Sequence, residues 1–170
     1  MKPFIRLETA VDYEAISLGH QAAFGGVGEA NLVDELRNEG MVAVSCVAEW
    51  EGEIVGHILF SRVKIHTTEG TMEALSLAPM SVEPNCQRQG IGTQLVEAGL
   101  DACRKCGHQI VLVLGHPEYY PRFGFSSQLA ARLPSVFGGE DAWMALELVP
   151  GALANIAGQV EFSLPFLKLI

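Results

Sequence analysis

The most constraining feature of this 170-residue chain is a strand–helix–strand pattern over residues 74–114. Residues 74–82 are apolar at nearly every position, which is typical of a central strand buried on both faces. An amphipathic stretch over 92–106 predicts a helix, and 110–114 is a short, wholly apolar strand. Because a helix joins the two strands, we expect them to run parallel in one sheet.

The rest of the chain predicts shorter elements. A strand is expected at 4–7, a helix at 11–24 capped by Thr9, and a helix at 29–38 with Leu32, Val33 and Leu36 on its apolar face. Two strands, 41–49 and 54–65, form a hairpin, and a polar loop covers 66–73. A strand near 143–148 and an extended piece near 160–166 follow. No linker or repeat interrupts the chain, so we expect a single domain, 1–170.

Charge and hydropathy exclude several classes of protein. The net charge of −9 disfavours nucleic acid as a partner, because phosphate binding needs clustered Lys and Arg. It is compatible with a cationic substrate. The chain has no apolar run near the roughly 18 residues of a membrane span, and its first residues do not resemble a signal peptide. We therefore expect a cytoplasmic protein that does not contact a membrane.

The four cysteines do not form a persuasive metal or redox motif. Cys103 and Cys106 have CxxC spacing, but they stand at the end of the predicted helix, where the dipole does not lower a thiol pKa. A second CxxC is absent, although His108 and His116 lie nearby in sequence. We expect helix-face thiols and no metal.

The loop between the central strand and the long helix carries the main functional signal. Gly90 and Gly92 stand at a helix N-terminus, where unpartnered N–H groups and the helix dipole favour an anion such as phosphate. Arg88 adds a positive charge. The P-loop pattern is absent, and a dinucleotide-binding pattern fails because Leu95 stands where the third glycine is needed. A tight turn without any ligand stays an open alternative at this point.

Three segments resemble the GNAT superfamily of N-acetyltransferases. Gln87-x-x-Gly90-x-Gly92, following Ser-Val-Glu-Pro, resembles its acetyl-CoA signature. LGHPEYYPRFGF at 114–125 is similar to its fifth strand and the helix after it, and VAEWEGEIVGHILF at 47–60 to its second and third strands. The resemblance implies the acyl-CoA N-acyltransferase fold. This fold is an α+β, three-layer arrangement with a mixed, mostly antiparallel sheet that splays between strands 4 and 5 and is flanked by helices.

The resemblance also implies where acetyl-CoA, the acyl-donor substrate, would bind. The pantetheine would lie along the fourth strand, where Pro79 removes a ladder hydrogen bond. The implied cofactor-binding residues are Met80, Ser81, Val82, Gln87, Arg88, Gln89, Gly90, Ile91, Gly92 and Thr93.

The implied reaction is direct attack of a primary amine on the thioester. Tyr120 occupies the position of a general acid, with Tyr119 as a neighbour that could take this role instead. Glu73 and His116 are candidate bases, and Glu29 or a water chain are alternatives. The acceptor is expected to be a small molecule or a peptide or protein N-terminus, and the acyl group to be acetyl or longer.

Two further alternatives stay open on the sequence. The chain could bind CoA without turnover, as a sensor or partner subunit, or it could bind a nucleotide instead of CoA. Homodimerisation is a third question that the sequence leaves undecided.

Overall fold

In a computed structural model of the chain, residues 2–169 are described. The strands are hydrogen-bonded in the order β1-β2-β3-β4-β5-β6, and β7 pairs with β3. The residues group into two compact units, each described here by itself. The first contains the described residues up to Phe60 together with Ala78–Ala102, and the second contains Ser61–Leu77 and the described residues from Cys103 onward.

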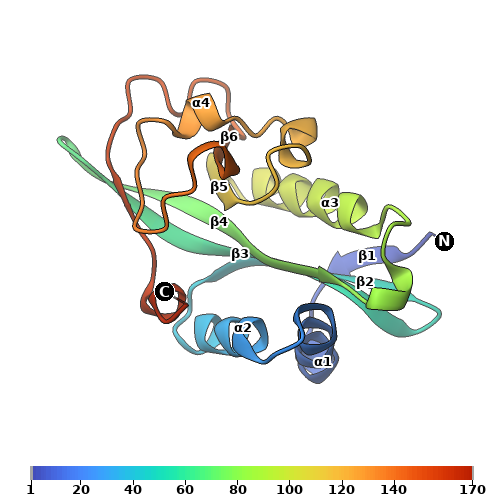
Figure 1. Cartoon of the computed structure of the whole chain (residues 1–170). Coiled ribbons are helices and arrows are strands. Elements are labelled where there is room, and N and C mark those ends of the chain that lie inside the picture. Colours follow the sequence, from blue (N-terminus) through green and yellow to red (C-terminus); the bar gives the residue numbers. More distant parts are fainter. Residues whose placement is uncertain (1, 170) are drawn as a thin grey trace. The chain divides into compact units, whose positions relative to one another are not determined.

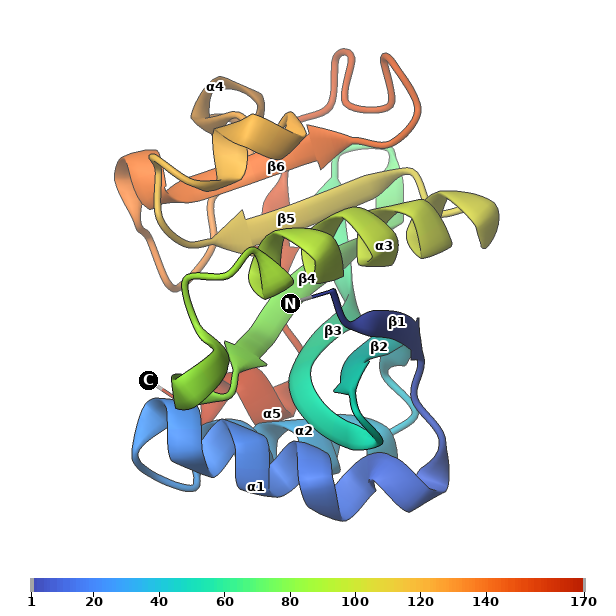
Figure 2. The ribbon, with the colours of Figure 1, turned by 90° about the vertical axis from the view of Figure 1, so that its right-hand side faces the viewer.

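The first unit holds β1 (Phe4–Leu7), β2 (Val42–Trp50), the first part of β3 (Glu53–Thr67) and the last part of β4 (Gly70–Val82). Helices α1 (Tyr13–Phe24) and α2 (Gly28–Asn38) lie side by side on one face of these strands, and α3 (Ile91–Lys105) lies on the other face (Figures 1 and 2). The core between the layers contains Leu32, Val33 and Leu36 of α2, as predicted, and Leu95 and Leu100 of α3. Burial of these apolar faces fixes the helices on the sheet.

The second unit holds the remaining parts of β3 and β4 with β5 (Ile110–Leu114), β6 (Trp143–Glu147) and β7 (Gln159–Glu161). β5 and β6 are antiparallel neighbours (Figure 2). Short helices α4 (Ser127–Ala130) and α5 (Leu164–Leu167) complete it, with a 3₁₀ helix at Tyr120–Phe123.

The parallel pairing of β4 with β5 is confirmed, and it covers only part of each strand. The ladder joins Leu75 to Val111 and Ser76 to Leu112. β4 nevertheless continues to Val82 and β5 to Leu114. This short ladder is what we predicted for a sheet that splays between these strands. Pro79, which follows a cis peptide bond, lies on β4 beyond the end of the ladder.

Three predictions about local structure were wrong in part. The predicted loop 66–73 is mostly strand, because β3 extends to Thr67 and β4 starts at Gly70, where Thr67 Oγ1 donates to the Gly70 carbonyl at 2.7 Å. The first helix begins as a 3₁₀ turn, Ala10–Asp12, with the Asp12 carboxylate accepting from Thr9 N–H. The predicted extended piece 160–166 ends in α5, which has Pro165 in its first turn, a favoured position for proline.

Among residues 2–169, we find no helix with the length and apolar character that crossing a membrane requires.

Candidate active site

The turn before α3 has the left-handed backbone conformation at one of the two glycines that indicated it. Gly90 has φ of 84°, in the left-handed region that a residue without Cβ adopts at low cost. Arg88 is also left-handed, with φ of 64°, whereas Gly92 lies within α3. The Gln87 side chain donates from Nε2 to the Val82 carbonyl at 3.0 Å and so ties the turn to the end of β4. Closely spaced residues in this conformation turn successive N–H groups toward one side, which makes a concavity suited to an anion.

The first backbone amides of α3 point out of the helix at this turn. The N–H of Gln94 makes the first helical bond, to the Gly90 carbonyl at 3.1 Å, so the amides of Ile91 and Gly92 precede the intrahelical ladder. Ile91 is buried and anchors the helix start, whereas residues 87–90 are exposed. A Cβ added at Gly90 would meet no atom within 4 Å, so the space over the turn is open.

The end of β4 presents two different faces. Met80 and Val82 alternate with Ser81, whose side chain is buried, because successive strand residues point to opposite faces. Gly56 on β3 allows the layers to approach: a Cβ there would lie 2.9 Å from Leu95 Cδ1 and 3.2 Å from the Ser81 carbonyl.

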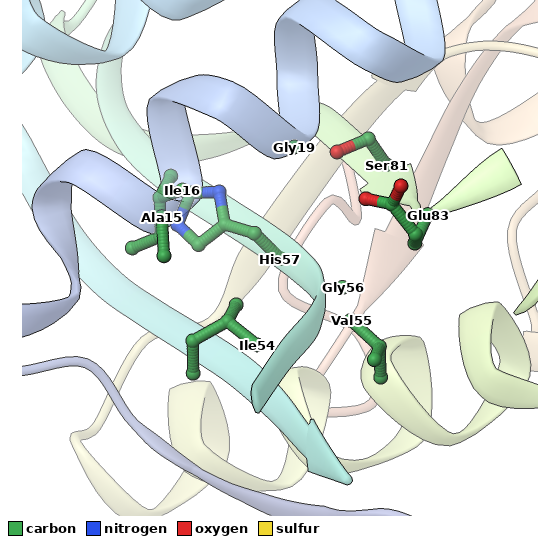
Figure 3. Close-up of a pocket in the computed structure, with 9 residues that line it drawn as sticks. All are labelled: Ala15, Ile16, Gly19, Ile54, Val55, Gly56, His57, Ser81 and Glu83. Carbon is green, nitrogen blue, oxygen red and sulfur yellow. The ribbon is translucent and has the colours of Figure 1, made fainter. Parts of the chain in front are cut away.

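A small niche lies on the α1 side of this strand end. Its lining includes Ser81 near the end of β4, Glu83 directly after β4, His57 of β3 and Gly19 of α1 (Figure 3). Its volume is about 10 Å³, which is enough for one water-sized group. In Figure 3 the Ser81 hydroxyl and the Glu83 carboxylate are directed to the same side, toward the helix that carries Gly19.

A buried hydrogen-bonded chain underlies the niche. His20 Nε2 lies 2.8 Å from His57 Nδ1, His57 Nε2 lies 2.7 Å from Ser45 Oγ, and Ser45 donates to Glu8 Oε1 at 2.5 Å. Arg37 binds both Glu8 oxygens, at 2.7 and 3.1 Å. Burial raises the pKa of Glu8, but the nearby His57 Nε2, 3.5 Å away, and the hydrogen bonds from Arg37 and Ser45 outweigh it and lower the pKa to about 2. Glu8 is therefore an anion that can only accept.

The proton positions in this chain follow from that anion. Ser45 gives its single proton to Glu8, so it accepts from Nε2–H of His57. His57 Nδ1 must then accept from Nε2–H of His20, which leaves His20 Nδ1 as a buried atom without a hydrogen-bond partner in the described residues. Burial lowers the pKa of both histidines, that of His20 to about 3. Both rings are neutral, and both nitrogens of His57 are hydrogen-bonded, one to His20 and the other to Ser45.

Tyr120 lies in the second unit, in the 3₁₀ helix after β5. Its ring is buried against Tyr119 and Phe125, with ring centroids 5.1 and 5.6 Å away. A Cβ at Gly115 would collide with this ring, so the glycine permits the close packing. Burial, with the charge of Tyr119 adding to it, raises the pKa of Tyr120 to about 12. The phenol is thus a proton donor, not a base, at neutral pH.

The two candidate bases named from the sequence also lie in the second unit. Glu73 is exposed on β4 and lies 3.8 Å from Arg62 Nε and 3.8 Å from His108 Nδ1. His116 is exposed, and its carbonyl accepts the N–H groups of Tyr119 and Tyr120. Glu29, the further alternative, is half-buried in the first turn of α2 in the first unit. The roles of all three stay predictions.

The cysteines form no cluster of metal ligands. Cys103 is buried on α3 and Cys106 is exposed just after it, and all four thiols, which lie within the described residues, are outside disulfides. Among residues 2–169, no group of three or more His, Cys, Asp and Glu side chains is placed to hold a metal ion.

Comparison with known proteins decides the family. Residues 42–127 match the model of the acetyltransferase (GNAT) domain. The N-acetyltransferase YhbS of Escherichia coli is 33% identical over 163 residues, which is 93% of this chain and 95% of that protein. The chain belongs to the GNAT acetyltransferase family.

Solved structures of GNAT proteins agree with this assignment. The crystal structure of YhbS from Escherichia coli in complex with CoA superimposes with a TM-score of 0.90 at 30% identity, covering 98% of this chain and 93% of that one. A GNAT acetyltransferase from Brucella melitensis in complex with acetyl-CoA gives a TM-score of 0.81 at 31% identity, covering 96% and 97%. The predicted family and the predicted fold are confirmed.

Sequence reasoning did not single out the niche. Glu83 was noted only as part of the Ser-Val-Glu-Pro run, although its position two residues after Ser81 puts both side chains on one face of the strand. Gly19 carried a second signal, because a glycine inside a predicted helix weakens it and calls for a reason. His57 could not have been paired with His20 from spacing alone, since 37 residues separate them.

Proposed function

We propose that this GNAT protein transfers an acetyl group from acetyl-CoA to a primary amine by direct attack on the thioester. The turn from Gln87 to Thr93 carries the proposal, because its left-handed residues and the leading amides of α3 suit the diphosphate of CoA. Arg88 and Gln89 are exposed beside it. The backbone of Met80, Ser81 and Val82 would hold the acyl-pantetheine.

The reaction makes three demands on the protein. A lysine-like amine must lose a proton, at a cost of about 4 kcal/mol near pH 7.4, whereas an α-amine costs far less. The thioester oxygen needs a donor, and one such donor is worth about 3–4 kcal/mol; an N–H of residues 80–82 is proposed for it. Finally, the CoA sulfur must receive a proton.

Tyr120 is the proposed general acid for the sulfur. Its raised pKa keeps the phenol protonated over the working pH range, so the proton is available when the thiolate leaves. Glu73 and His116 are the candidate bases carried over from the sequence. Because each is exposed to water, either would have to act through solvent or through a bound acceptor.

The domain organisation, the acceptor, the oligomeric state and the location of the protein are also proposed. The whole chain would act as one acetyltransferase domain, because β3 and β4 run without interruption through both compact units. A small amine or a peptide N-terminus is the proposed acceptor, and a homodimer is the state to test. A cytoplasmic location is supported by the four cysteines, which are thiols and not disulfides.

Calorimetric titration tests whether the protein binds CoA. We expect CoA and acetyl-CoA to bind the protein, and ATP and NAD⁺ to bind at least tenfold more weakly. Release of CoA thiol would then be followed with three amines: spermidine, L-lysine and an alanine-initiated tripeptide amide. Binding without release from any amine would instead support a CoA sensor, and no binding of CoA would refute the proposal.

A pair of glycine variants separates cofactor contact from backbone strain. Gly90→Val and Gly40→Val each place a β-branched residue at a left-handed position, with φ of 84° and 69°, and neither Cβ meets another atom within 4 Å. We expect similar losses of melting temperature in both variants. Only Gly90→Val should weaken CoA binding, by at least tenfold. Equal CoA affinities in the two variants would contradict the assigned turn.

A further inference from the structure

A cleft that is much larger than the niche lies beside the start of β6 in the second unit. Its walls are α4, which lies next to β6 (Figure 2), and part of the segment 131–142 that connects α4 to β6. The volume of the cleft is about 210 Å³. Since a cavity of about 150 Å³ already accommodates benzene, the cleft can hold a ligand portion of about six non-hydrogen atoms.

The lining of the cleft is largely apolar. Trp143 forms part of it, and its indole N–H is already engaged, because Nε1 donates to the Leu133 carbonyl at 2.7 Å. The indole therefore offers a ligand its apolar and π-electron surface, and tryptophan is the aromatic side chain that attracts cations best. The cleft is also bordered by Ser127, Ala130, Pro134, Ser135 and Glu140.

Glu140 is the only residue with an ionisable side chain among those that line the cleft. It is exposed, and in the part of the chain that the structure describes its carboxylate has no ion-pair partner. Arg132, on the same connecting segment, is exposed and does not line the cleft. An apolar wall with one unpaired carboxylate is complementary to a cation that carries an apolar chain.

The backbone of Glu140 has an unfavourable conformation. Its φ is 47°, in the left-handed region that a residue with a Cβ rarely adopts. Glu51 has a similar φ of 51°, but it stands in the two-residue turn between β2 and β3, where left-handed residues are required. Glu140 instead starts a 3₁₀ helix, Glu140–Ala142, whose residues ordinarily have negative φ. The placement of a glutamate here is consistent with a functional role.

The cleft adjoins the end of β5, next to the proposed general acid. Leu114 pairs with Trp143, and the next residue, Gly115, donates its N–H to the Ala142 carbonyl at 2.9 Å. The Tyr120 ring packs against Gly115. Because successive residues along a strand point to opposite faces, Tyr120 lies on one face at this end of β5, and Leu114 and Trp143 lie on the other. A ligand in the cleft therefore reaches the end of β5 without displacing the acid.

We propose that this cleft binds the second, non-reacting ammonium group of a linear di- or polyamine acceptor, with the Glu140 carboxylate as its counter-ion. The inference rests on the proposed acetyl transfer and names the class of amine. The methylene chain between the two nitrogens crosses Leu114, which is 46% exposed at the end of β5. Hydroxyls of Ser127 and Ser135 accept further N–H bonds of the bound ammonium. The net charge of −9 favours a multiply charged cation over a neutral or anionic acceptor.

The first experiment measures binding without turnover. The chain has two tryptophans, Trp50 on β2 and Trp143, so a ¹⁵N-labelled sample gives two indole N–H signals, which Trp50→Phe assigns. We expect 1,5-diaminopentane to shift the Trp143 signal in a saturable way and to leave the Trp50 signal in place, whereas 1,5-pentanediol shifts neither. In Glu140→Gln the Kd of the diamine should rise at least tenfold. An unmoved Trp143 signal, or an equal Kd in Glu140→Gln, would overturn the inference.

The second experiment measures the preference for a diamine during acetyl transfer. Each α,ω-diaminoalkane of three to eight carbons is compared with the alkylamine in which a methyl group replaces the second amino group. At the best chain length, kcat/KM of the parent protein should be at least tenfold higher for the diamine, after correction for its two equivalent amino groups. The preference should fall below twofold in Glu140→Gln, with acetyl-CoA affinity unchanged. A parent protein without the preference, or a variant that keeps it, would contradict the assigned cleft.

The two left-handed glutamates provide a matched control. Glu140→Gly and Glu51→Gly each replace a left-handed residue by one that adopts this conformation freely, so we expect similar, small changes of melting temperature. Only Glu140→Gly should lose the preference for the diamine. Asp141→Asn removes an exposed carboxylate that does not line the cleft and should keep the preference. If Glu51→Gly or Asp141→Asn loses it to the same extent, general charge and not Glu140 selects the amine, and the assignment is wrong.

The outcomes separate this inference from the proposed function. The Trp143 shift needs neither CoA nor turnover. Failure of CoA to bind, or of every amine to release thiol, refutes the proposed function whether or not Trp143 responds to the diamine. Turnover of amines without a diamine preference and without a Trp143 shift overturns the assignment of the cleft alone.

Discussion

The buried histidine pair makes the stability of this protein depend on pH in a way that a single substitution can isolate. His20 is fully buried, and its Nδ1 has no hydrogen-bond partner in the described residues. Burial lowers the pKa of His20 to about 3. Because the unfolded chain binds a proton near pH 6.5 and the folded chain does not, the unfolded state holds more protons between these two values. The free energy of unfolding must therefore fall as the pH is lowered through this window.

The expected magnitude follows from the two pKa values of His20. Its contribution to the free energy of unfolding should decrease by about 2 kcal/mol between pH 7.5 and pH 5.0. His57 adds a loss of the same sign, since its pKa is also lowered by burial. Replacing His20 by Gln keeps an N–H donor for His57 Nδ1 and removes one titrating group.

Urea unfolding followed by circular dichroism at pH 8.5, 7.5, 6.5, 5.5 and 5.0 measures this difference. The unfolding free energies of the parent and of His20→Gln should run parallel from pH 8.5 to 7.5, because both histidines are neutral in both states there. Below pH 6.5 the parent should lose stability more steeply than the variant, by about 2 kcal/mol in total at pH 5.0. Parallel curves down to pH 5.0 would refute the neutral, buried assignment of His20.

Two further predictions concern Tyr120 and the packing of α3. Tyr120→Phe should lower kcat about 100-fold, the order expected on loss of a general acid, while calorimetry finds the CoA affinity unchanged; parental turnover would rule out the acid role. Gly99→Ala should destabilise the protein by about 1–3 kcal/mol, because overpacking a core is costly and the new Cβ would lie 2.5 Å from Phe60 Cε2. Urea unfolding measures the loss, and an unchanged midpoint would mean that Phe60 can move aside.

Much of the fold was predictable because the decisive signals are local. The strand–helix–strand unit around α3 follows from apolar runs of the right length, and the structure reproduces its parallel pairing at Leu75 and Ser76. The turn at Gly90 follows from the absence of a Cβ, and its positive φ bears this out. The loop 66–73 was wrong because polar strand residues at an exposed hairpin do not differ in composition from a loop.

The niche and the histidine chain depend on contacts that no local pattern contains. His20 and His57 lie on α1 and β3, and Ser45 and Glu8 join them from two other segments. Neutral buried histidines arise only after α1 packs on the sheet and excludes water, which is a property of the assembled layers.

The sequence by itself determined the family, the order of the main elements and the glycine turn, because spacing and missing side chains act within a few residues of the chain. Tertiary structure decided which polar side chains are buried next to one another. His57, for example, is hydrogen-bonded at both nitrogens only once folding has brought it to His20 on one side and to Ser45 on the other. The physical reason is that proton affinity and free volume belong to the surroundings of a group, and those surroundings are assembled from distant parts of the chain.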